Sequence, residues 1–539
     1  MSVFSSVKMY ARFARGFRPF LDRHVTLTEA RDIVRRRLQD RETAFLRMVE
    51  RGIYGYPRSP YLPLLGLAGC EFGDIRTMVR ARGMEATLRS LREAGVYVSF
   101  EEFKGRQPIQ RNGTVVEVGP RTFDNPYTTQ CYEAESGGTT GAGSRVAHDL
   151  DDIVARLPMT MLAQEAQGIL HVPKATWRGV LPNAVGIGQM LNGALIGNVP
   201  KRWFTPTSSR DRKTALKFRL ANFYIVEVGR LYGVPIPRPE HVPLDRAVVV
   251  ARWAAETLRA HRACHVNTSA GMAVRISLAA QQEGLDLTGA VITGAGEPPT
   301  PAKVRAIAKS GARHIANYHC SGVGAIGYNC ANPIDCNDQH FVAPNLAMIQ
   351  YPREVPGSDI VVEAFNMTSL LPTAPKILLN VEIDDYGVVE KRTCGCPLEE
   401  LGLPTHIREI RSFRKLTGEG ITLIGSDMEH ILDEVLPAKF GGSPIDYQLW
   451  EEEDEQGLTR LSLIVSPKVK LENEQAVIDT VLRSLTGLNS GAEGARAIWA
   501  QAGALRVKRA EPVWTSRGKL MPLHLVKRSK SAQHAPAAK

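Results

Sequence analysis

The chain has 539 residues, of which 43% are hydrophobic and 23% charged. This is the composition of a soluble globular protein long enough for two or three domains. Its eight cysteines are too few for a disulfide scaffold, so we expect a reduced, cytoplasmic protein. The formal net charge of +11 gathers at the two ends, because residues 1–21 and 527–539 contain basic but no acidic side chains. The rest of the chain therefore gives little reason to expect nucleic-acid binding.

Residues 1–25 form a basic amphipathic segment without the apolar core of a secretion signal. Arg12, Arg15 and Arg18 alternate with aromatic residues, which suits a helix lying on anionic lipid. The other interpretation, which we favour, is a helix folded onto the large domain. The most apolar long stretch, residues 179–199, is interrupted by polar residues and glycines, which argues against a membrane span.

Helical periodicity follows at residues 26–51 and 75–94, with Thr26 and Glu29 spaced as a capping box. From residue 146 to about 350, apolar runs alternate with helical patterns, which predicts βα units and a largely parallel sheet. After Arg411 the pattern becomes that of a small α+β module, with a hairpin from residues 447–450 and 458–465 and helices at 428–436 and 474–485. We therefore divide the chain into 1–25, a large domain 26–412, a small domain 413–526 and a disordered basic tail 527–539.

Glycines and hydroxyls concentrate between Ser136 and Arg145, in the sequence Ser-Gly-Gly-Thr-Thr-Gly-Ala-Gly-Ser-Arg. Glycine permits positive φ angles and close approach, so backbone N–H groups and hydroxyls here can surround a phosphate. No Gly-Lys-Ser/Thr follows at the spacing of a Walker A loop. The segment predicts a phosphate-binding loop of another kind, with a surface turn as the alternative.

The cysteines form two close pairs, Cys330 with Cys336 and Cys394 with Cys396. Four soft ligands in two pairs suit a tetrahedral zinc ion. His340 is an alternative ligand, and four ordinary thiols are the alternative to a metal site.

In order along the chain, five segments resemble the motifs of adenylate-forming enzymes, from about Asp124 to Pro522. The first is the loop at Ser136. The others are Gly294-Ala295-Gly296-Glu297-Pro298-Pro299-Thr300, Tyr318-His319-Cys320-Ser321-Gly322, the region of Asp384 and Asp385, and Gly518-Lys519. The spacing of the cysteines is similar to that in the phenylacetate–CoA ligase-like branch. The resemblance implies an α/β fold, with a large adenylation domain of mainly parallel sheets and a small, mobile α+β C-terminal domain that turns near Gly418.

The resemblance also implies roles for individual residues. Lys519 is expected to be catalytic, and Asp385 to accept the ribose hydroxyls, with Asp384 as an alternative. Tyr318 is expected to stack on adenine. The nucleotide-binding set is Ser136, Gly137, Gly138, Thr139, Thr140, Gly141, Arg145, Gly296, Glu297, Pro298, Tyr318, Ser321, Asp385 and Lys415, and the zinc ligands are Cys330, Cys336, Cys394 and Cys396.

The expected cofactors are ATP, Mg²⁺, coenzyme A as co-substrate and structural Zn²⁺. The implied reaction joins a small-molecule carboxylate to the thiol of coenzyme A through an acyl-adenylate. Transfer to a carrier-protein thiol and an impaired nucleotide-binding relative are the alternatives. Two departures from the family pattern suggest the impaired relative. Gly322 stands where the family has a Mg²⁺-binding glutamate, and Gly143-Ser144 stand where it has Pro-Lys.

Overall fold

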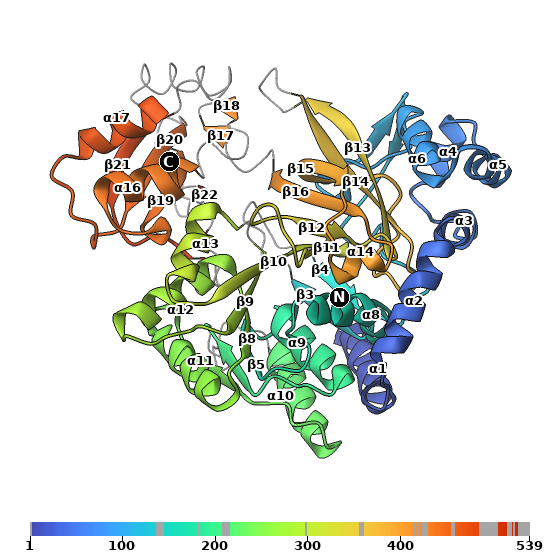
Figure 1. Cartoon of the computed structure of the whole chain (residues 1–539). Helices are drawn as coiled ribbons and strands as arrows, with labels where there is room; N and C mark the ends of the chain where they lie inside the picture. Colours follow the sequence, from blue (N-terminus) through green and yellow to red (C-terminus); the bar gives the residue numbers. More distant parts are fainter. Residues whose placement is uncertain are drawn as a thin grey trace, which may run out of the picture.

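The computed structural model describes residues 3–525 except 136–144, 182, 207–215, 297–298, 355–360, 413–416, 419–420, 423–429, 454–458, 485–504, 515–519 and 521–522. Figure 1 shows a large domain of helices packed around a sheet, with a small C-terminal module beside helix α13. Among the described residues, no helix is long and apolar enough to cross a membrane.

Helices make up most of the first hundred residues. They are α1 (Val3–Leu21), α2 (Leu27–Gln39), α3 (Arg41–Val49), α4 (Leu62–Leu67), α5 (Phe72–Arg82), α6 (Met84–Glu93) and α7 (Phe100–Phe103). The predicted capping box is confirmed, since the Thr26 hydroxyl accepts a hydrogen bond from the Glu29 N–H and the Glu29 carboxylate accepts one from the Thr26 N–H. Such reciprocal bonds satisfy N–H groups that a helix start leaves open.

The large sheet has twelve strands in the order β13-β14-β15-β16-β12-β11-β10-β9-β8-β5-β6-β7. Its parallel half consists of β5 (Lys174–Trp177), β6 (Arg202–Thr205), β7 (Pro239–His241), β8 (Cys264–Thr268), β9 (Ala290–Ala295) and β10 (Arg313–Cys320). The other half is antiparallel and consists of β11 (Gly324–Asn329), β12 (Gln339–Phe341), β13 (Leu346–Glu354), β14 (Val361–Ser369), β15 (Val381–Lys391) and β16 (Thr405–Ser412).

The prediction of mainly parallel sheets is therefore correct for only half of this sheet, which is mixed. After β10 the strands follow one another through short connections, without the crossover helices that parallel pairing requires. β10 lies between the halves, with the parallel strand β9 on one side and the antiparallel strand β11 on the other.

Helices cover both faces of the parallel half: α8 (Leu150–Ala166), α9 (Ala184–Ile196), α10 (Leu216–Leu231), α11 (Val248–His261), α12 (Ala270–Gln282) and α13 (Pro301–Ala308). Alternate residues of β6 point to opposite faces, because side chains alternate along a strand. Trp203 packs in the core formed with α1, α9 and α10, whereas Phe204 packs in the core formed with α11 and α12.

Helix α1 is part of the first of these cores. Phe13, Phe17 and Phe20 are buried there, at 2%, 0% and 1% exposure. Phe13 and Phe17 meet the ring of Tyr224 of α10, with centroids 6.1 and 6.3 Å apart. The packing supports the interpretation of a helix folded onto the large domain, and these three rings are not available to lipid.

The small module has a four-stranded sheet in the order β21-β20-β19-β22. The predicted hairpin is confirmed as β19 (Tyr447–Glu453) paired with β20 (Thr459–Val465), flanked by β21 (Leu505–Arg509) and β22 (Leu523–Leu525). A π-helical turn η3 (Ile431–Val435), α16 (Leu436–Phe440) and α17 (Glu474–Ser484) cover it.

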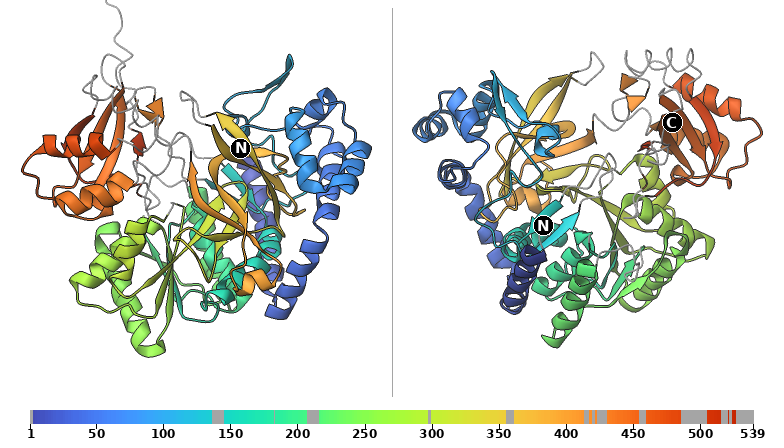
Figure 2. Two further views of the ribbon diagram at one scale, coloured as in Figure 1. Left: turned by 45° about the horizontal axis from the view of Figure 1, so that its top comes forward. Right: turned by 180° about the vertical axis from the view of Figure 1, so that it is seen from behind.

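A buried polar contact joins the small module to α13. The Thr300 hydroxyl donates to the Asp433 carboxylate at 2.7 Å, and the Lys303 ammonium lies 3.6 Å from the same oxygen. Ile445 and Leu520 extend the apolar core formed by α11 and α12. Both views in Figure 2 show the module on this side of the large domain.

Candidate functional site

Tyr318 and Asp385, 67 residues apart in the sequence, meet at the junction of the two halves of the sheet. The Tyr318 hydroxyl donates to the Asp385 carboxylate at 2.6 Å, and the Tyr318 N–H donates to Gln339 at 2.7 Å. Burial, and then the charge of Asp385, raise the pKa of Tyr318 well above its usual value, so the phenol remains a donor. The structure thus brings together the residues expected at adenine and ribose.

Asp384 and Asp385 lie on β15. Asp384 is buried and adopts φ 70°. Asp385 is the residue whose carboxylate accepts the hydrogen bond from the Tyr318 hydroxyl. This contact makes Asp385 the better candidate for the ribose ligand, which stays a prediction.

Gly296 directly follows β9, with φ 91°. The preceding residue, Ala295, pairs with Asn317 of β10, so Gly296 lies near the level of Tyr318 along the sheet. Ser321 is exposed in the turn between β10 and β11. Both positions are at the carboxyl ends of parallel strands, where open α/β sheets bind ligands.

Gly322 occupies this same turn with φ 89°, a conformation that strains other residues. A Cβ atom here would lie 3.3 Å from both the Lys376 Cδ and the Phe103 Cζ atoms. The Lys376 ammonium is in turn 2.6 Å from the Asp124 carboxylate. The space around residue 322 is thus filled by other side chains, which gives a physical reason for glycine at the position expected to hold a glutamate.

Several predicted site residues lie outside the described part of the chain: Ser136, Gly137, Gly138, Thr139, Thr140, Gly141, Glu297, Pro298, Lys415 and Lys519. The elements that flank two of these segments are described. Residues 136–144 connect β3 (Tyr132–Glu135) to β4 (Arg145–His148), an antiparallel pair in which Glu135 is opposite Arg145. Residues 515–519 connect Trp514 to Leu520, which form a β-bridge.

Two further residues near the strand ends were not predicted. Arg178 is 3% exposed just after β5, and it donates to Asn267 at 3.2 Å, to the Thr268 carbonyl and to the Ala295 carbonyl at 3.1 Å. It thereby ties the carboxyl ends of three parallel strands. His319 meets the Tyr328 ring edge-on at 6.1 Å, and its buried surroundings, followed by the charges of Arg156 and Arg178, lower its pKa to about 4. The only indication in the sequence was position, because Arg178 directly follows a strand and His319 lies within one.

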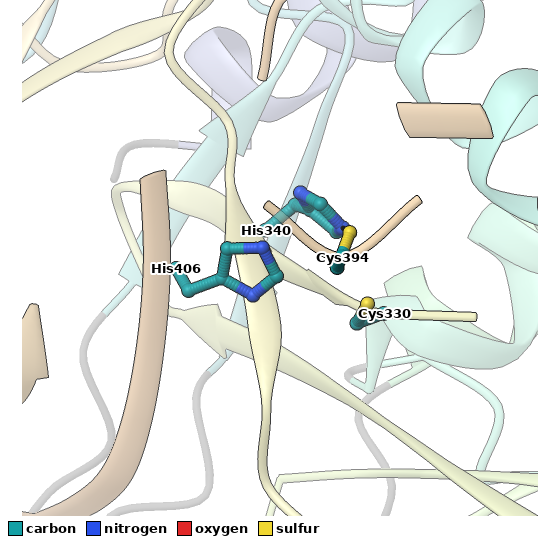
Figure 3. Close-up of side chains that lie close together, drawn as sticks. All are labelled: Cys330, His340, Cys394 and His406. Atoms are coloured by element: carbon teal, nitrogen blue, oxygen red, sulfur yellow. Dashed lines mark hydrogen bonds between the residues drawn. The ribbon is translucent and has the colours of Figure 1, made fainter. Parts of the chain in front are cut away.

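A cluster of thiols and imidazoles lies where β12 and β16 pair, next to the end of β11. We call Cys330, Cys394, Cys396, His340 and His406 the thiol cluster. One ligand atom each of Cys330, His340, Cys394 and His406 lies within 4.8 Å of the others, and Figure 3 shows these side chains directed toward one another. The Cys396 and Cys394 sulfurs are 3.0 and 3.6 Å from the His340 Nε2 atom. Hydrogen bonding with Cys330, and also His340, lowers the pKa of Cys396, which favours a thiolate.

The remaining nitrogens orient the two imidazoles. His340 Nδ1 lies 2.7 Å from the Leu403 carbonyl and His406 Nδ1 lies 2.6 Å from the Asp338 carboxylate. Because a carbonyl only accepts hydrogen bonds, His340 donates from Nδ1, and this bond directs its Nε2 atom toward the cysteine sulfurs. Thiolates with imidazoles held in this way are typical of zinc sites, so the donor set fits Zn²⁺.

The ligand set differs from the predicted one at Cys336. Its sulfur lies 3.7 Å from the Pro299 carbonyl rather than in the thiol cluster. His340, named as an alternative, is in the cluster, and His406 was not predicted. Cys336 lies in the connection from β11 to β12, and sequence spacing alone could not show that its sulfur lies apart from Cys330.

No family model matches the chain, and no curated protein matches it. Among solved structures, it is similar to 2-hydroxyisobutyryl-CoA ligase in complex with its acyl-adenylate, with a TM-score of 0.50 and 12% identity over 95% of this chain and 92% of that one. The chain has the fold of adenylate-forming enzymes. Lower scores relate it to the anthranilate CoA ligase AuaEII (0.43, 12% identity, 81% and 74% covered) and to McyG A-PCP (0.42, 11% identity, 83% and 72% covered). At these identities the likeness concerns the fold, and membership of the family and of its branch stays a prediction.

Proposed function

We propose that this protein is an ATP-dependent ligase that joins a small carboxylate to a thiol, with coenzyme A as the acceptor. The observation that carries the proposal is the contact between Tyr318 and Asp385 at the carboxyl ends of the strands. A donor and a carboxylate held together there suit the adenine and ribose of ATP. The fold supports the same chemistry.

In the proposed reaction, the substrate carboxylate attacks the α-phosphate of ATP to give an acyl-adenylate and pyrophosphate. A thiol then attacks the acyl carbon, and AMP leaves. The glycine-rich loop 136–144 would bind the departing phosphates, and Lys519 would stabilise the charge that develops on the α-phosphate. Mg²⁺ would neutralise the phosphate oxygens, and Zn²⁺ in the thiol cluster would have a structural role.

Gly322 favours one competing function, a nucleotide-binding relative with impaired ligase activity. Its positive φ would strain a glutamate, and a Cβ atom there would lie 3.3 Å from both the Lys376 Cδ and the Phe103 Cζ atoms. Such a protein would bind ATP without releasing pyrophosphate in response to any carboxylate.

The deciding experiment measures pyrophosphate release over a panel of aryl, short-chain and long-chain carboxylates. We expect at least one acid to drive release by the unaltered protein. The Lys519→Ala variant should release pyrophosphate at least about a hundredfold more slowly, since it loses the transition-state charge, whereas the exposed-lysine control Lys470→Ala should keep the full rate. Equal rates in Lys519→Ala and the unaltered protein would contradict the mechanism.

A second arm separates the alternatives. Thioester formation with coenzyme A and with a phosphopantetheinyl carrier protein identifies the acceptor. A melting temperature raised by ATP without release from any acid would support the impaired relative instead.

A further inference from the structure

Helix α10 exposes large apolar side chains on the face opposite the one it buries. Leu216, Leu220, Phe223 and Leu231 are 65%, 59%, 67% and 81% exposed, and Tyr232, just after the helix, is 42% exposed. We call these five residues the α10 face. The inner positions Phe218, Ala221, Ile225 and Val226 are buried against α1 and α9. A helix that is apolar on both faces requires a second apolar environment.

Basic side chains are exposed on α10 and on the neighbouring helix α1. Arg219 and Arg230 of α10 are exposed, and the neighbouring helix α1 exposes Arg12, Arg15 and Arg18. The Arg18 guanidinium lies 5.7 Å from the centre of the Tyr232 ring, which joins the two groups at one edge. Together, α1 and α10 contain seven basic residues and one acidic residue.

The single acid does not offset these charges. Glu227 is paired with Arg238 at 2.7 and 3.0 Å. Because both oxygens of Glu227 are occupied by this fork, the surface keeps its excess of positive charge.

We propose that the α10 face binds the surface of an anionic lipid membrane, with its leucines and Phe223 in the boundary between headgroups and acyl chains. Apolar side chains flanked by cations are the arrangement of interfacial helices, and each basic residue near an anionic leaflet adds to the attraction. Arg18 of α1 supplies charge at this surface, while the three buried phenylalanines of α1 remain in the core.

The charge also disfavours two other occupants. A second copy would bring the same arginines face to face, and five apolar residues are few beside the roughly 20 residues that a stable protein interface uses on each side. An acidic carrier protein would have to deliver its thiol to the Tyr318–Asp385 site, but Figure 1 shows α10 at the opposite end of the large domain from β15, the strand of Asp385.

The test is co-sedimentation with vesicles of phosphatidylcholine alone and of phosphatidylcholine mixed with phosphatidylglycerol, without ATP. We expect binding to the anionic vesicles that weakens as salt is added. The Leu220→Ser/Phe223→Ser variant should bind at least about tenfold more weakly, because two large apolar side chains no longer enter the bilayer. The Arg15→Gln/Arg219→Gln variant should lose the preference for anionic vesicles.

The control is Val115→Ser, which changes a 54% exposed residue of the separate β1–β2 hairpin (Ile109–Arg111 and Thr114–Val116) and should bind like the unaltered protein. All variants change exposed side chains, so circular dichroism should show unaltered folding. Absence of binding, or equal binding by Leu220→Ser/Phe223→Ser, overturns the proposal. Light scattering that shows a dimer dissociated by this variant also overturns it, in favour of a second copy.

Discussion

At the scale of single residues, the orientation of two imidazoles favours a metal site over a chance group of thiols. His340 and His406 each have Nδ1 next to an acceptor, and Asp338, which holds His406, is itself paired with Arg392. The Nε2 atom of His406 is buried without a hydrogen-bond partner in the described part of the chain. A buried imidazole lone pair is costly unless it is used, and a metal ion would use it.

The first prediction concerns the ligand set. The purified protein should contain zinc, and Cys394→Ser and His340→Ala should lower both zinc content and melting temperature, because each removes a ligand. Cys336→Ser is the matched control and should keep its zinc. If Cys336→Ser lost its zinc and His340→Ala kept all of it, the result would contradict this ligand set and support the four cysteines as the ligands.

A second prediction concerns the support of His406. Asp338→Asn replaces the carboxylate that holds Nδ1, so zinc affinity should fall about 10- to 100-fold if His406 is a ligand. Competition with a chromophoric chelator measures this. Unchanged affinity would limit the site to Cys330, His340, Cys394 and Cys396.

At the scale of elements, sequence patterns predicted what local periodicity determines. The β19–β20 hairpin and the capping box at Thr26 follow from alternation and from cap chemistry, and both are confirmed. The antiparallel half of the large sheet was not predicted. Its pairing of β12 with β16 could not be, because it joins residues more than sixty positions apart. Arg178 and His406 were missed for the same reason, since their partners are distant in the sequence.

The third prediction concerns the contact between α13 and η3. Asp433→Ala should lower the free energy of unfolding by about 3–5 kcal/mol, because Lys303, 4% exposed, loses a buried carboxylate. The double variant Lys303→Met/Asp433→Leu should lose less, since it leaves neither charge buried. Urea unfolding measures both.

Arg305→Ala is the control for this contact. Arg305 lies 3.3 Å from Glu434 and its side chain is 62% exposed, so the change should stay within about 1 kcal/mol. A double variant less stable than Asp433→Ala would show that the buried pair contributes net stability.

At the scale of the whole molecule, a buried histidine links stability to pH. His265, 3% exposed, lies 2.7 Å from the Thr293 hydroxyl, and burial, followed by the charges of Lys174 and Arg313, lowers its pKa to about 3. In the unfolded chain this histidine has a pKa of 6.5, so below pH 6.5 the unfolded chain binds a proton there that the folded protein does not bind. The stability that this residue provides is therefore complete above pH 6.5 and is lost as the pH falls toward 3.

The fourth prediction follows from this linkage. The free energy of unfolding should fall by up to about 1.4 kcal/mol per pH unit below pH 6.5 through His265 alone. His265→Gln should show a correspondingly flatter dependence in urea unfolding at pH 7, 6 and 5, whereas the exposed control His241→Gln should follow the unaltered protein. An unchanged slope in His265→Gln would contradict the assignment.

The Thr300 hydroxyl has two simultaneous partners. It donates its proton to Asp433 of the small module, and it accepts a hydrogen bond from the Lys303 N–H at 3.3 Å, which caps α13. If the small module separates from the large domain, only the proton loses its partner, and water can take it. The cap at the start of α13 uses a lone pair of the Thr300 oxygen and not its proton, so the cap survives. Separation of the small module would therefore leave the cap of α13 in place, while parting Lys303 from Asp433 and removing Ile445 and Leu520 from the core of α11 and α12.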